Sequence, residues 1–386
     1  MNAQSSAESS DEPVLVWRDG HLGRITLNRP RALNSLTHPM VRRIDEALAA
    51  WEHDDAVSAV LITGAGERGL CAGADIRAIY EDVRSSRQSS QQQGSDGDHV
   101  IAEASCAFFR DEYRLNAHIA AYRKPYIAVM DGITMGGGVG ISAHGSVRVV
   151  TDRSTIAMPE TLIGLVPDIG ATYLLSRAPG EIGTHLALTG ASIGAGDAIA
   201  CGLADFYVPV VRIDELVDGL TAADADTDPA DVVRRHAEPA PQGEPAAHRS
   251  WIDACYAAAP NDDPTADTVE RIVARLEADG RPAAKETAEL IGGRSPTALK
   301  AALRSMRRAR RLDTLEAVLQ QEYRVSCAFL SHPDLVEGIR AQIIDKDRRP
   351  HWSPPRLDQV AAADVERCFA PPVGGDLTFN GHQADG

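Results

Sequence analysis

The residues that could do chemistry are a run of glycines and the carboxylates that follow it. Gly136, Gly137 and Gly138 come shortly after Tyr126–Met130, an apolar run typical of a buried strand. A strand, a turn without side chains and a helix start leave backbone N–H groups unpaired. Such groups can hold an anion, or a carbonyl oxygen that becomes negative during a reaction. A tight turn with close helix–strand packing explains the glycines equally well, and neither G-x-G-x-x-G nor the P-loop pattern is present.

Two carboxylates follow the glycines in apolar surroundings. Glu160 and Asp168 each come directly after a proline. A carboxylate in a dry setting should have a raised pKa, which suits a general base, a general acid or a nucleophile. Alternatively each carboxylate caps a helix or accepts backbone N–H bonds, and this alternative is stronger for Asp168 than for Glu160. Glu112 by itself is typical of a solvated helix charge, and His144 of a packing residue.

Composition limits the function classes. The chain has 386 residues, 44% of them hydrophobic, so it can bury a sizeable core. A formal net charge of -16 argues against a protein that binds nucleic acids or anionic membranes non-specifically. The six cysteines are scattered without a C-x-x-C pair, so neither a metal site nor a disulfide framework is predicted, and a reducing, cytoplasmic setting is expected. We expect no membrane-spanning segment, and no signal or transit peptide in Met1–Glu12.

The first half of the chain alternates strand and helix patterns, which predicts an α/β fold. A hairpin is expected at Val14–Leu27, turned at Asp19–Gly20, and a helix is expected from Thr37. Further strands are predicted at 57–63, 126–130, 147–151, 155–158 and 205–210, and further helices after Asp75, at 99–122 and at 171–177.

The second half is different in composition. Residues 222–249 are rich in Ala, Asp, Pro and Glu, which indicates a linker or loosely packed helices. From Trp251 the pattern is helical, most clearly at 265–278, 295–311 and 312–330. The predicted organisation is a disordered N-terminus (1–13), a core (14–210), a linker (211–249), a helical C-terminal region (250–355) and a tail (356–386).

Two segments have unusual composition. Residues 85–98 are Ser- and Gln-rich, which predicts a mobile insertion rather than a packed element. The stretch from Arg304 to Arg311, with Lys300, would ordinarily be a solvated helix face, but it could also meet phosphates.

Two glycine-containing segments resemble motifs of a known enzyme family. Cys71-Ala-Gly-Ala-Asp75, together with Gly136-Gly-Gly138, is similar to the crotonase (enoyl-CoA hydratase/isomerase) superfamily. The resemblance implies a crotonase (ClpP-like) spiral of ββα units. It also implies an oxyanion hole for an acyl-CoA thioester carbonyl, formed by the amides of Ala74 and Gly137.

Further motifs resemble a subgroup of thioester hydrolases that act on a short-chain 3-hydroxyacyl-CoA in valine breakdown. Their joint order covers residues 14 to 354, and the motifs are Met158–Thr161, Val166–Asp168, Ser295–Lys300, Glu322–Arg324, Glu337–Ala341, Ile344–Asp347 and Pro350–Trp352. The resemblance implies that Glu160 attacks the carbonyl or activates water, that Asp168 orients water or the 3-hydroxyl, and that Glu112 contacts the substrate.

The resemblance also implies where coenzyme A binds. The residues concerned are the Leu70–Ala74 segment, including Ala72, and its neighbours Asp75, Ile76 and Arg29. Coenzyme A is part of the substrate, so no separate cofactor is implied, and a homo-oligomer is possible in this superfamily.

One departure narrows the reaction. Hydratases of the family usually carry a Glu in a G-G-G-x-E pattern, and this chain has Gly140 there. An enoyl-CoA hydratase or isomerase is therefore the first rival interpretation, and a non-catalytic acyl-CoA-binding protein is the second. The residues at 70 and 74 and the insertion at 85–98 differ from relatives near the expected entrance, which leaves the acyl preference open.

Overall fold

A mainly parallel sheet forms the centre of the molecule. The computed structural model describes residues 11–92, 102–258 and 267–379. Of the N-terminus predicted to be disordered (1–13), residues 1–10 lie outside this range, whereas Glu12 and Pro13 accept hydrogen bonds from Asn28. Within it, a six-stranded sheet has the order β1-β2-β3-β4-β6-β8, and β5 pairs with β7 in a small second sheet. Only β1 and β2 are antiparallel in the large sheet. The strands are β1 Val14–Asp19, β2 Leu22–Leu27, β3 Ala59–Gly64, β4 Tyr126–Met130, β5 Ile133–Met135, β6 Val147–Val150, β7 Thr155–Ala157 and β8 Phe206–Tyr207.

Helices follow the strands through the first half of the chain, as the alternation predicts. The hairpin of β1 and β2 is confirmed, with Val14 opposite Leu27. The helix expected after Thr37 is α1, with Pro39 in its first turn. The helices of this half are α1 His38–Glu52, α2 Ile76–Gln92, α3 Glu103–Ala120, α4 Gly137–Gly140, α5 Ala171–Ser176, α6 Ile182–Thr189 and α7 Ala195–Ala200, with 3-10 turns η1 Pro30–Ala32 and η2 Glu160–Ile163.

The central strands are covered on both faces, which explains why they are apolar throughout. In β3, Val60 and Ile62 pack into the main core, whereas Ala59 and Leu61 face a smaller cluster on the opposite side. That smaller cluster is closed by apolar residues of α8 (Ile213–Thr221) and α9 (Pro229–His236). Residues 213–221 and 229–236 are therefore packed helices, and the prediction of a linker is wrong for them. The composition was misleading because the polar residues occupy the outer faces of short amphipathic helices.

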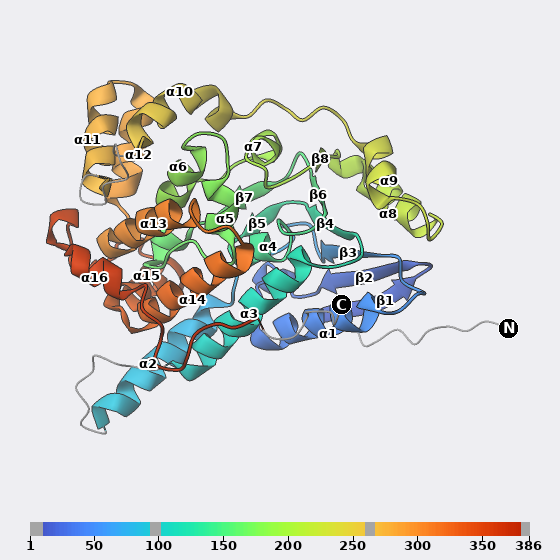
Figure 1. The fold of residues 1–386 in the computed structure, drawn as a ribbon, viewed down its shortest axis with the longest axis horizontal. Coiled ribbons are helices and arrows are strands. Elements are labelled where there is room, and N and C mark those ends of the chain that lie inside the picture. The colour runs from blue at the N-terminus through green and yellow to red at the C-terminus, as the bar shows by residue number, and fades with distance from the viewer. Residues whose placement is uncertain (1–10, 93–101, 259–266, 380–386) are drawn as a thin grey trace.

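Helices dominate the rest of the chain and lie beside the core (Figure 1). They are α10 Glu244–Tyr256, α11 Val269–Asp279, α12 Pro282–Gly292, α13 Pro296–Ala309, α14 Leu315–Ser331, α15 Pro333–Ile339 and α16 Ala362–Arg367, with η3 Val210–Arg212, a π-helical turn η5 Arg340–Ile344 and η6 Leu357–Gln359. The tail from 356 continues this packing as far as residue 379. Leu377 is fully buried, and Asp376 pairs with Arg324 of α14 at 2.5 Å.

The predicted mobile insertion is wrong for residues 85–92, because α2 continues through them to Gln92. The Arg87 guanidinium, half-buried, donates to the carbonyls of Ser331 and His332 at 3.1 and 3.0 Å. These bonds tie the last turns of α2 to the end of α14. Residues 93–98 lie outside the described range. No helix among the described residues has the length and apolarity needed to cross a membrane.

Candidate active site

Two backbone segments that are distant in sequence run side by side at the site. Residues 69–74 bridge to residues 131–135: Cys71 N donates to Ile133 O at 3.1 Å, and Met135 N donates to Cys71 O at 2.9 Å. The pairing places the turn at Gly73–Ala74 against the turn at Gly136–Gly137. Ala74 N lies 3.5 Å from the point where a Cβ atom on Gly137 would be, and Gly137 N lies 3.6 Å from the equivalent point on Gly73.

The amides of Ala74 and Gly137 have no hydrogen-bond acceptor among the described residues. Gly137 is the first residue of α4, where an N–H group has no partner within the helix. Gly136 has φ +48°, a conformation that a side chain rarely adopts. The structure thus brings together two unpaired donors, which is the arrangement an oxyanion hole requires.

Glu160 lies directly beside this pair of amides. It starts η2 after Pro159, and its Oε1 atom is 2.9 Å from the point where a Cβ on Gly136 would be. Glu160 is 7% exposed, and Oε2 has no partner among the described groups. Burial, followed by repulsion from the Asp168 charge, raises its pKa well above the ordinary value. Glu160 can therefore hold a proton or take one up at neutral pH.

Glu112 reaches the same place from α3. Its Oε1 atom would collide with a Cβ on Gly137, and it has no partner among the described groups. Glu112 is 1% exposed, so the solvated helix charge expected from the sequence alone is wrong. Burial, and then the charge of Asp168, raises its pKa well above the ordinary value.

Asp168 completes a group of three buried carboxylates. Burial raises its pKa to about 6, and hydrogen bonds from Tyr113 and Ser326 oppose the rise. Tyr113 Oη donates to Asp168 Oδ2 at 2.5 Å. Sequence reasoning missed Tyr113, although it directly follows Glu112. It also missed Ser326 and Asn116, which carry no sequence signal of their own.

His144 and Cys71 are packing residues, as predicted. His144 Nε2 lies 2.8 Å from Ile169 O, and burial lowers the pKa of the imidazole to about 4. Cys71 is fully buried, and burial raises the pKa of its thiol to about 12. A thiol with that pKa is a poor nucleophile. Among the described residues, no three His, Cys, Asp or Glu side chains are placed to share a metal ion.

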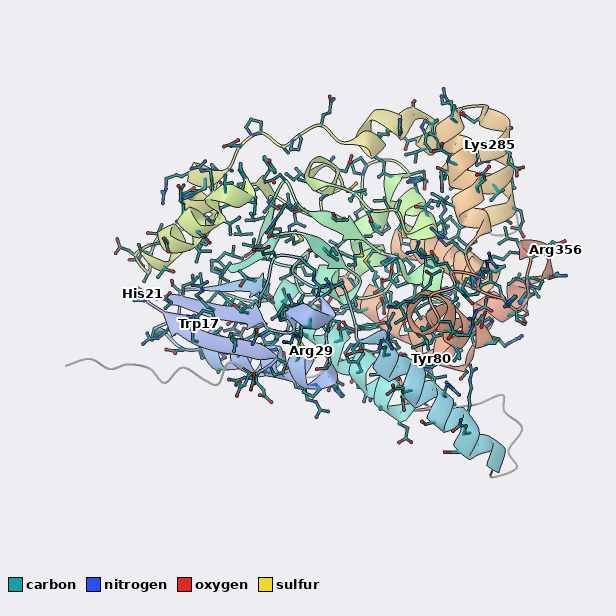
Figure 2. All side chains as sticks on the ribbon, turned by 180° about the vertical axis from the view of Figure 1, so that it is seen from behind. Trp17, His21, Arg29, Tyr80, Lys285 and Arg356 are labelled. Carbon is teal, nitrogen blue, oxygen red and sulfur yellow. The ribbon has the colours of Figure 1, made fainter. Side chains whose placement is uncertain are left out.

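The residues suggested for coenzyme A lie at the rim of this site. Leu70 is buried, whereas Ala72, Asp75 and Ile76 are partly exposed. Arg29 is already engaged, since its guanidinium bonds Asp75 Oδ2 at 3.0 Å and Ser35 O at 2.6 Å. Figure 2 shows Arg29 where the N-terminal strands meet α2 and α3, with Tyr80 on α2 nearby.

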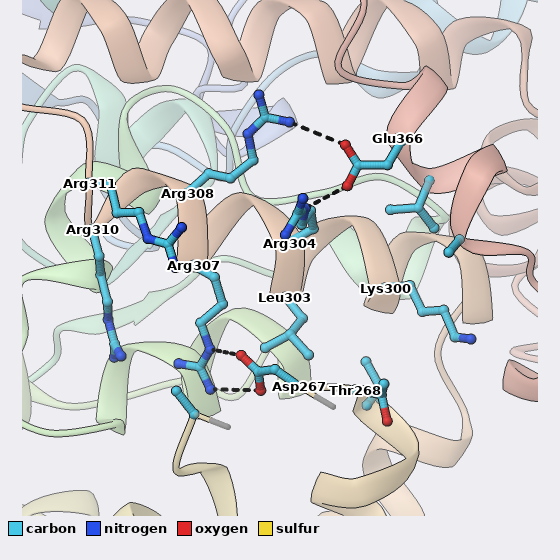
Figure 3. A pocket seen from close by; sticks show the side chains of 14 residues that line it. Asp267, Thr268, Lys300, Leu303, Arg304, Arg307, Arg308, Arg310, Arg311 and Glu366 are labelled. Carbon is cyan, nitrogen blue, oxygen red and sulfur yellow. Dashed lines mark hydrogen bonds and ion pairs between the residues drawn. The ribbon is translucent and has the colours of Figure 1, made fainter. Parts of the chain in front are cut away.

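The basic stretch of α13 lies elsewhere. Lys300 and the arginines line a cavity of about 630 Å³ between α13, the start of α11 and α16 (Figure 3). The cations are largely matched by carboxylates. Lys300 pairs with Glu270, Arg304 and Arg308 share Glu366, Arg307 pairs with Asp267 and Glu181, and Arg310 pairs with Glu181. We therefore do not place the substrate phosphates in this cavity.

The chain is similar to known proteins over nearly its whole length. The enoyl-CoA hydratase/isomerase family model matches residues 22–369. Curated relatives named "3-hydroxyisobutyryl-CoA hydrolase, mitochondrial" include the Bos taurus protein, 41% identical over 95% of this chain and 90% of its own length. The Homo sapiens protein of the same name is 38% identical over 95% of this chain and 91% of its own length.

Two solved structures share the fold and much of the sequence. A carnitinyl-CoA dehydratase from Mycobacterium thermoresistibile is 52% identical, with a TM-score of 0.86 over 96% of this chain and all of its own. An enoyl-CoA hydratase from Rhodobacter sphaeroides is 39% identical, with a TM-score of 0.82 over 95% of this chain and all of its own. The expected fold class is thereby confirmed, and this chain, with its crotonase fold, belongs to the enoyl-CoA hydratase/isomerase family.

Proposed function

We propose that this chain hydrolyses the thioester of 3-hydroxyisobutyryl-CoA, or of a close short-chain 3-hydroxyacyl-CoA, to the free acid and CoA, as in valine catabolism. One observation carries the proposal: the buried carboxylate of Glu160 lies against Gly136, next to the unpaired amide of Gly137, which faces the unpaired amide of Ala74. The names of the curated relatives support the choice of reaction and substrate.

In the proposed mechanism the thioester carbonyl oxygen accepts from the Ala74 and Gly137 amides. The tetrahedral intermediate places a full negative charge on that oxygen, so the two donors bind it more strongly than the ground state. One such donor is typically worth about 3–4 kcal/mol of barrier. No metal or cofactor is needed for this step, because the backbone dipoles supply the polarisation.

Glu160 drives the cleavage in one of two ways. As a base it takes a proton from water, the hydroxide adds to the carbonyl carbon, and the C–S bond breaks as the CoA thiolate leaves and is protonated. As a nucleophile its carboxylate adds to the carbonyl carbon, the C–S bond breaks as the CoA thiolate leaves and is protonated, and water hydrolyses the resulting acyl-glutamyl anhydride to the free acid and Glu160. In both cases Glu160 must first ionise, and the nearby Asp168 charge opposes this. We propose that Asp168 orients the water or the 3-hydroxyl, and that Glu112 contacts the acyl group.

A hydratase or dehydratase is the second candidate, because the dehydratase named above is 52% identical to this chain. Gly140 counts against it, since addition of water to an enoyl-CoA in this family usually employs two glutamates, and the chain has glycine at the second position. A non-catalytic acyl-CoA-binding protein is disfavoured by three buried carboxylates, two of which have oxygens without a partner among the described groups.

A thiol-release assay across acyl-CoA substrates tests the proposal. We expect free CoA from 3-hydroxyisobutyryl-CoA, slower release from acyl-CoAs without a 3-hydroxyl, and no change in the enoyl absorbance of crotonyl-CoA. Fast loss of that absorbance without free thiol would establish the hydratase instead. Dehydration of carnitinyl-CoA without thiol would point to the dehydratase, and no reaction with any substrate at high enzyme concentration would favour a binding protein.

We also propose that CoA lies along Leu70–Ala74 with Asp75, Ile76 and Arg29 at the rim, and that no cofactor beyond this substrate is used. For the setting we propose a reducing compartment, in the first instance the cytoplasm. All six cysteines are unpaired, which supports the reducing environment. Cell fractionation tests the location, and it is informative because the curated relatives are named mitochondrial. A homo-oligomer remains a proposal for light scattering to test.

A further inference from the structure

The loop that carries Asp168 has an unfavourable backbone conformation. Ile169 has φ +58° and Gly170 has φ +79°. A β-branched residue in the left-handed region is rare and strained, so it persists only where surrounding contacts impose it. The identity of those contacts therefore shows what positions Asp168.

Helix α14 supplies the contacts to the loop backbone. Glu322 Oε2 accepts from Gly170 N at 2.6 Å, and its Oε1 accepts from Thr172 N at 2.9 Å and from Thr172 Oγ1 at 2.6 Å. Glu322 is fully buried. From the other side, His144 Nε2 lies 2.8 Å from Ile169 O, and because the buried imidazole stays neutral, the carbonyl fixes the Nε2–H tautomer.

A second set of contacts holds the carboxylate itself. Tyr113 Oη donates to Asp168 Oδ2 at 2.5 Å and lies 2.8 Å from Ser326 Oγ. Tyr113 and Ser326 are fully buried. Burial, then the Asp168 charge, raises the pKa of Tyr113 well above the ordinary value, so it stays a neutral phenol that can donate.

Each of the two sets of contacts includes a residue of α14, and these two residues lie on one face of the helix. Glu322 and Ser326 are four residues apart, one helical turn, and α14 packs against α3 and α5, which hold Tyr113 and Thr172. In Figure 1, α14 lies between α13 and α3. The C-terminal helical region thus reaches the reacting side chains directly rather than only covering them.

We propose that Tyr113, Ser326 and Glu322 are positioning residues that hold the Asp168 carboxylate in its working orientation. The proposal rests on the proposed function, in which Asp168 orients water or the substrate hydroxyl. Tyr113 holds Oδ2 of Asp168, and Glu322 prevents the strained loop from relaxing. Ser326 contacts both the Asp168 carboxylate and the Tyr113 hydroxyl.

Tyr113→Phe is the decisive variant, since it removes one hydroxyl from a packed ring. The Tyr113 hydrogen bond stabilises the ionised carboxylate, so its loss should raise the pKa of Asp168. We expect kcat to fall about 10–100-fold with KM changed less than about threefold, because a small misplacement of a reacting group has that effect. The acidic limb of the kcat/KM profile should move to higher pH. Ser326→Ala should shift the same limb by less.

Tyr323→Phe is the matched control. Tyr323 lies on α14 with its ring centroid 6.3 Å from that of Tyr113, and its hydroxyl accepts from Arg110 at 2.7 Å rather than contacting Asp168. We expect this variant to keep the wild-type profile. If Tyr113→Phe and Tyr323→Phe have the same pH profile and kcat, the proposal is overturned.

A measurement without substrate separates this inference from the proposed function. Infrared spectra of protein labelled with 13C at the aspartate carboxyls, compared with Asp168→Asn, report the ionisation of Asp168 directly. An Asp168 signal that titrates at higher pH in Tyr113→Phe supports the positioning role even if the wild type releases no thiol. An unchanged titration contradicts it whatever the substrate.

Glu322→Gln places an amide donor against backbone donors, and we expect it to lower kcat and the melting temperature together.

Discussion

Glu160 Oε1 lies 2.9 Å from the point where a Cβ atom on Gly136 would be, so the space between the two residues has no room for a side chain. Gly136→Ala should therefore push the carboxylate away from the Ala74 and Gly137 amides. We expect thiol release to fall by about 10²-fold, since displacement by 1 Å has that effect. Steady-state kinetics with 3-hydroxyisobutyryl-CoA measure it.

The control for that variant is Gly280→Ala. Gly280 also has a positive φ, +83°, but nothing lies within 4 Å of its would-be Cβ. The backbone cost is larger at Gly136, whose ψ is −123°, than at Gly280, whose ψ is −7°, so melting temperatures are measured with the kinetics, and only Gly136→Ala should lose turnover in the folded protein. Equal activity in the two variants would show that Glu160 does not need its place beside Gly136.

Removing the charge of Glu160 should stop the reaction without unfolding the protein. Glu160→Gln keeps the shape of the side chain, and Oε2 has no partner among the described groups to lose. We expect a decrease in kcat of about 10²–10⁴-fold, the usual contribution of an acid–base group. Glu46→Gln, an exposed acid on α1, is the control. A near-wild-type rate in Glu160→Gln would remove Glu160 from the mechanism.

The buried carboxylates should make the free protein less stable as the pH rises. The folded-state pKa is raised to about 6 for Asp168 and about 8 for Glu322, above the ordinary values of 3.8 and 4.5. Between these limits the folded state retains protons that the unfolded chain has released. The stabilising contribution is thus complete below about pH 4 and is lost as the pH rises toward 8.

Thermal denaturation between pH 5 and 8 checks this prediction. Each extra proton bound by the folded state lowers stability by about 1.4 kcal/mol per pH unit. Below pH 6.5 the lowered pKa values of His144 and His185 act in the opposite direction, so the fall in melting temperature is expected between pH 6.5 and pH 8. Glu160→Gln removes one raised pKa and should flatten the slope. A melting temperature that rises steadily from pH 5 to 8 would mean that these groups are ionised in the folded protein.

The sequence predicted the fold to a useful extent because the signals were local. The alternation of strands and helices, the β1–β2 hairpin and the turn after β4 follow from apolar periodicity and glycine spacing. The predictions for residues 213–221, 229–236 and 85–92 failed because their polar composition conceals helices. The apolar side of such a helix is buried only by contacts with the rest of the folded chain.

The site was predictable only in part. The sequence gives no reason why Glu112 is buried, because burial depends on α4 packing against α3 with glycine at position 137. Glu322 was part of a motif, but its contacts and those of Ser326 could not be predicted for the same reason: their partners are about 150 and 210 residues away and meet them only in the folded chain. Motifs indicated the reacting groups, whereas the groups that hold them emerge from packing.

Asn116 and Gly140 make a last testable pair. A Cβ on Gly140 would lie 2.8 Å from Asn116 Nδ2 and 3.0 Å from Ile169 Cβ, so the amide occupies the space above the glycine. Gly140→Ala should destabilise the protein by about 1–3 kcal/mol through overpacking. Asn116→Ala should cost little, because the buried amide has no partner among the described groups.

In the double variant the new methyl group enters the space that the amide has left, so the combined loss should be smaller than the sum by about 1 kcal/mol. Denaturant unfolding of the four proteins measures this coupling, and Gly202→Ala, a glycine with nothing within 4 Å of its would-be Cβ, should show none with Asn116→Ala. Strict additivity at 116 and 140 would mean that the amide moves aside freely. In that case the Asn116 amide would leave room for a side chain at position 140. Packing would then not explain why this chain lacks the glutamate that hydratases of the family usually carry there.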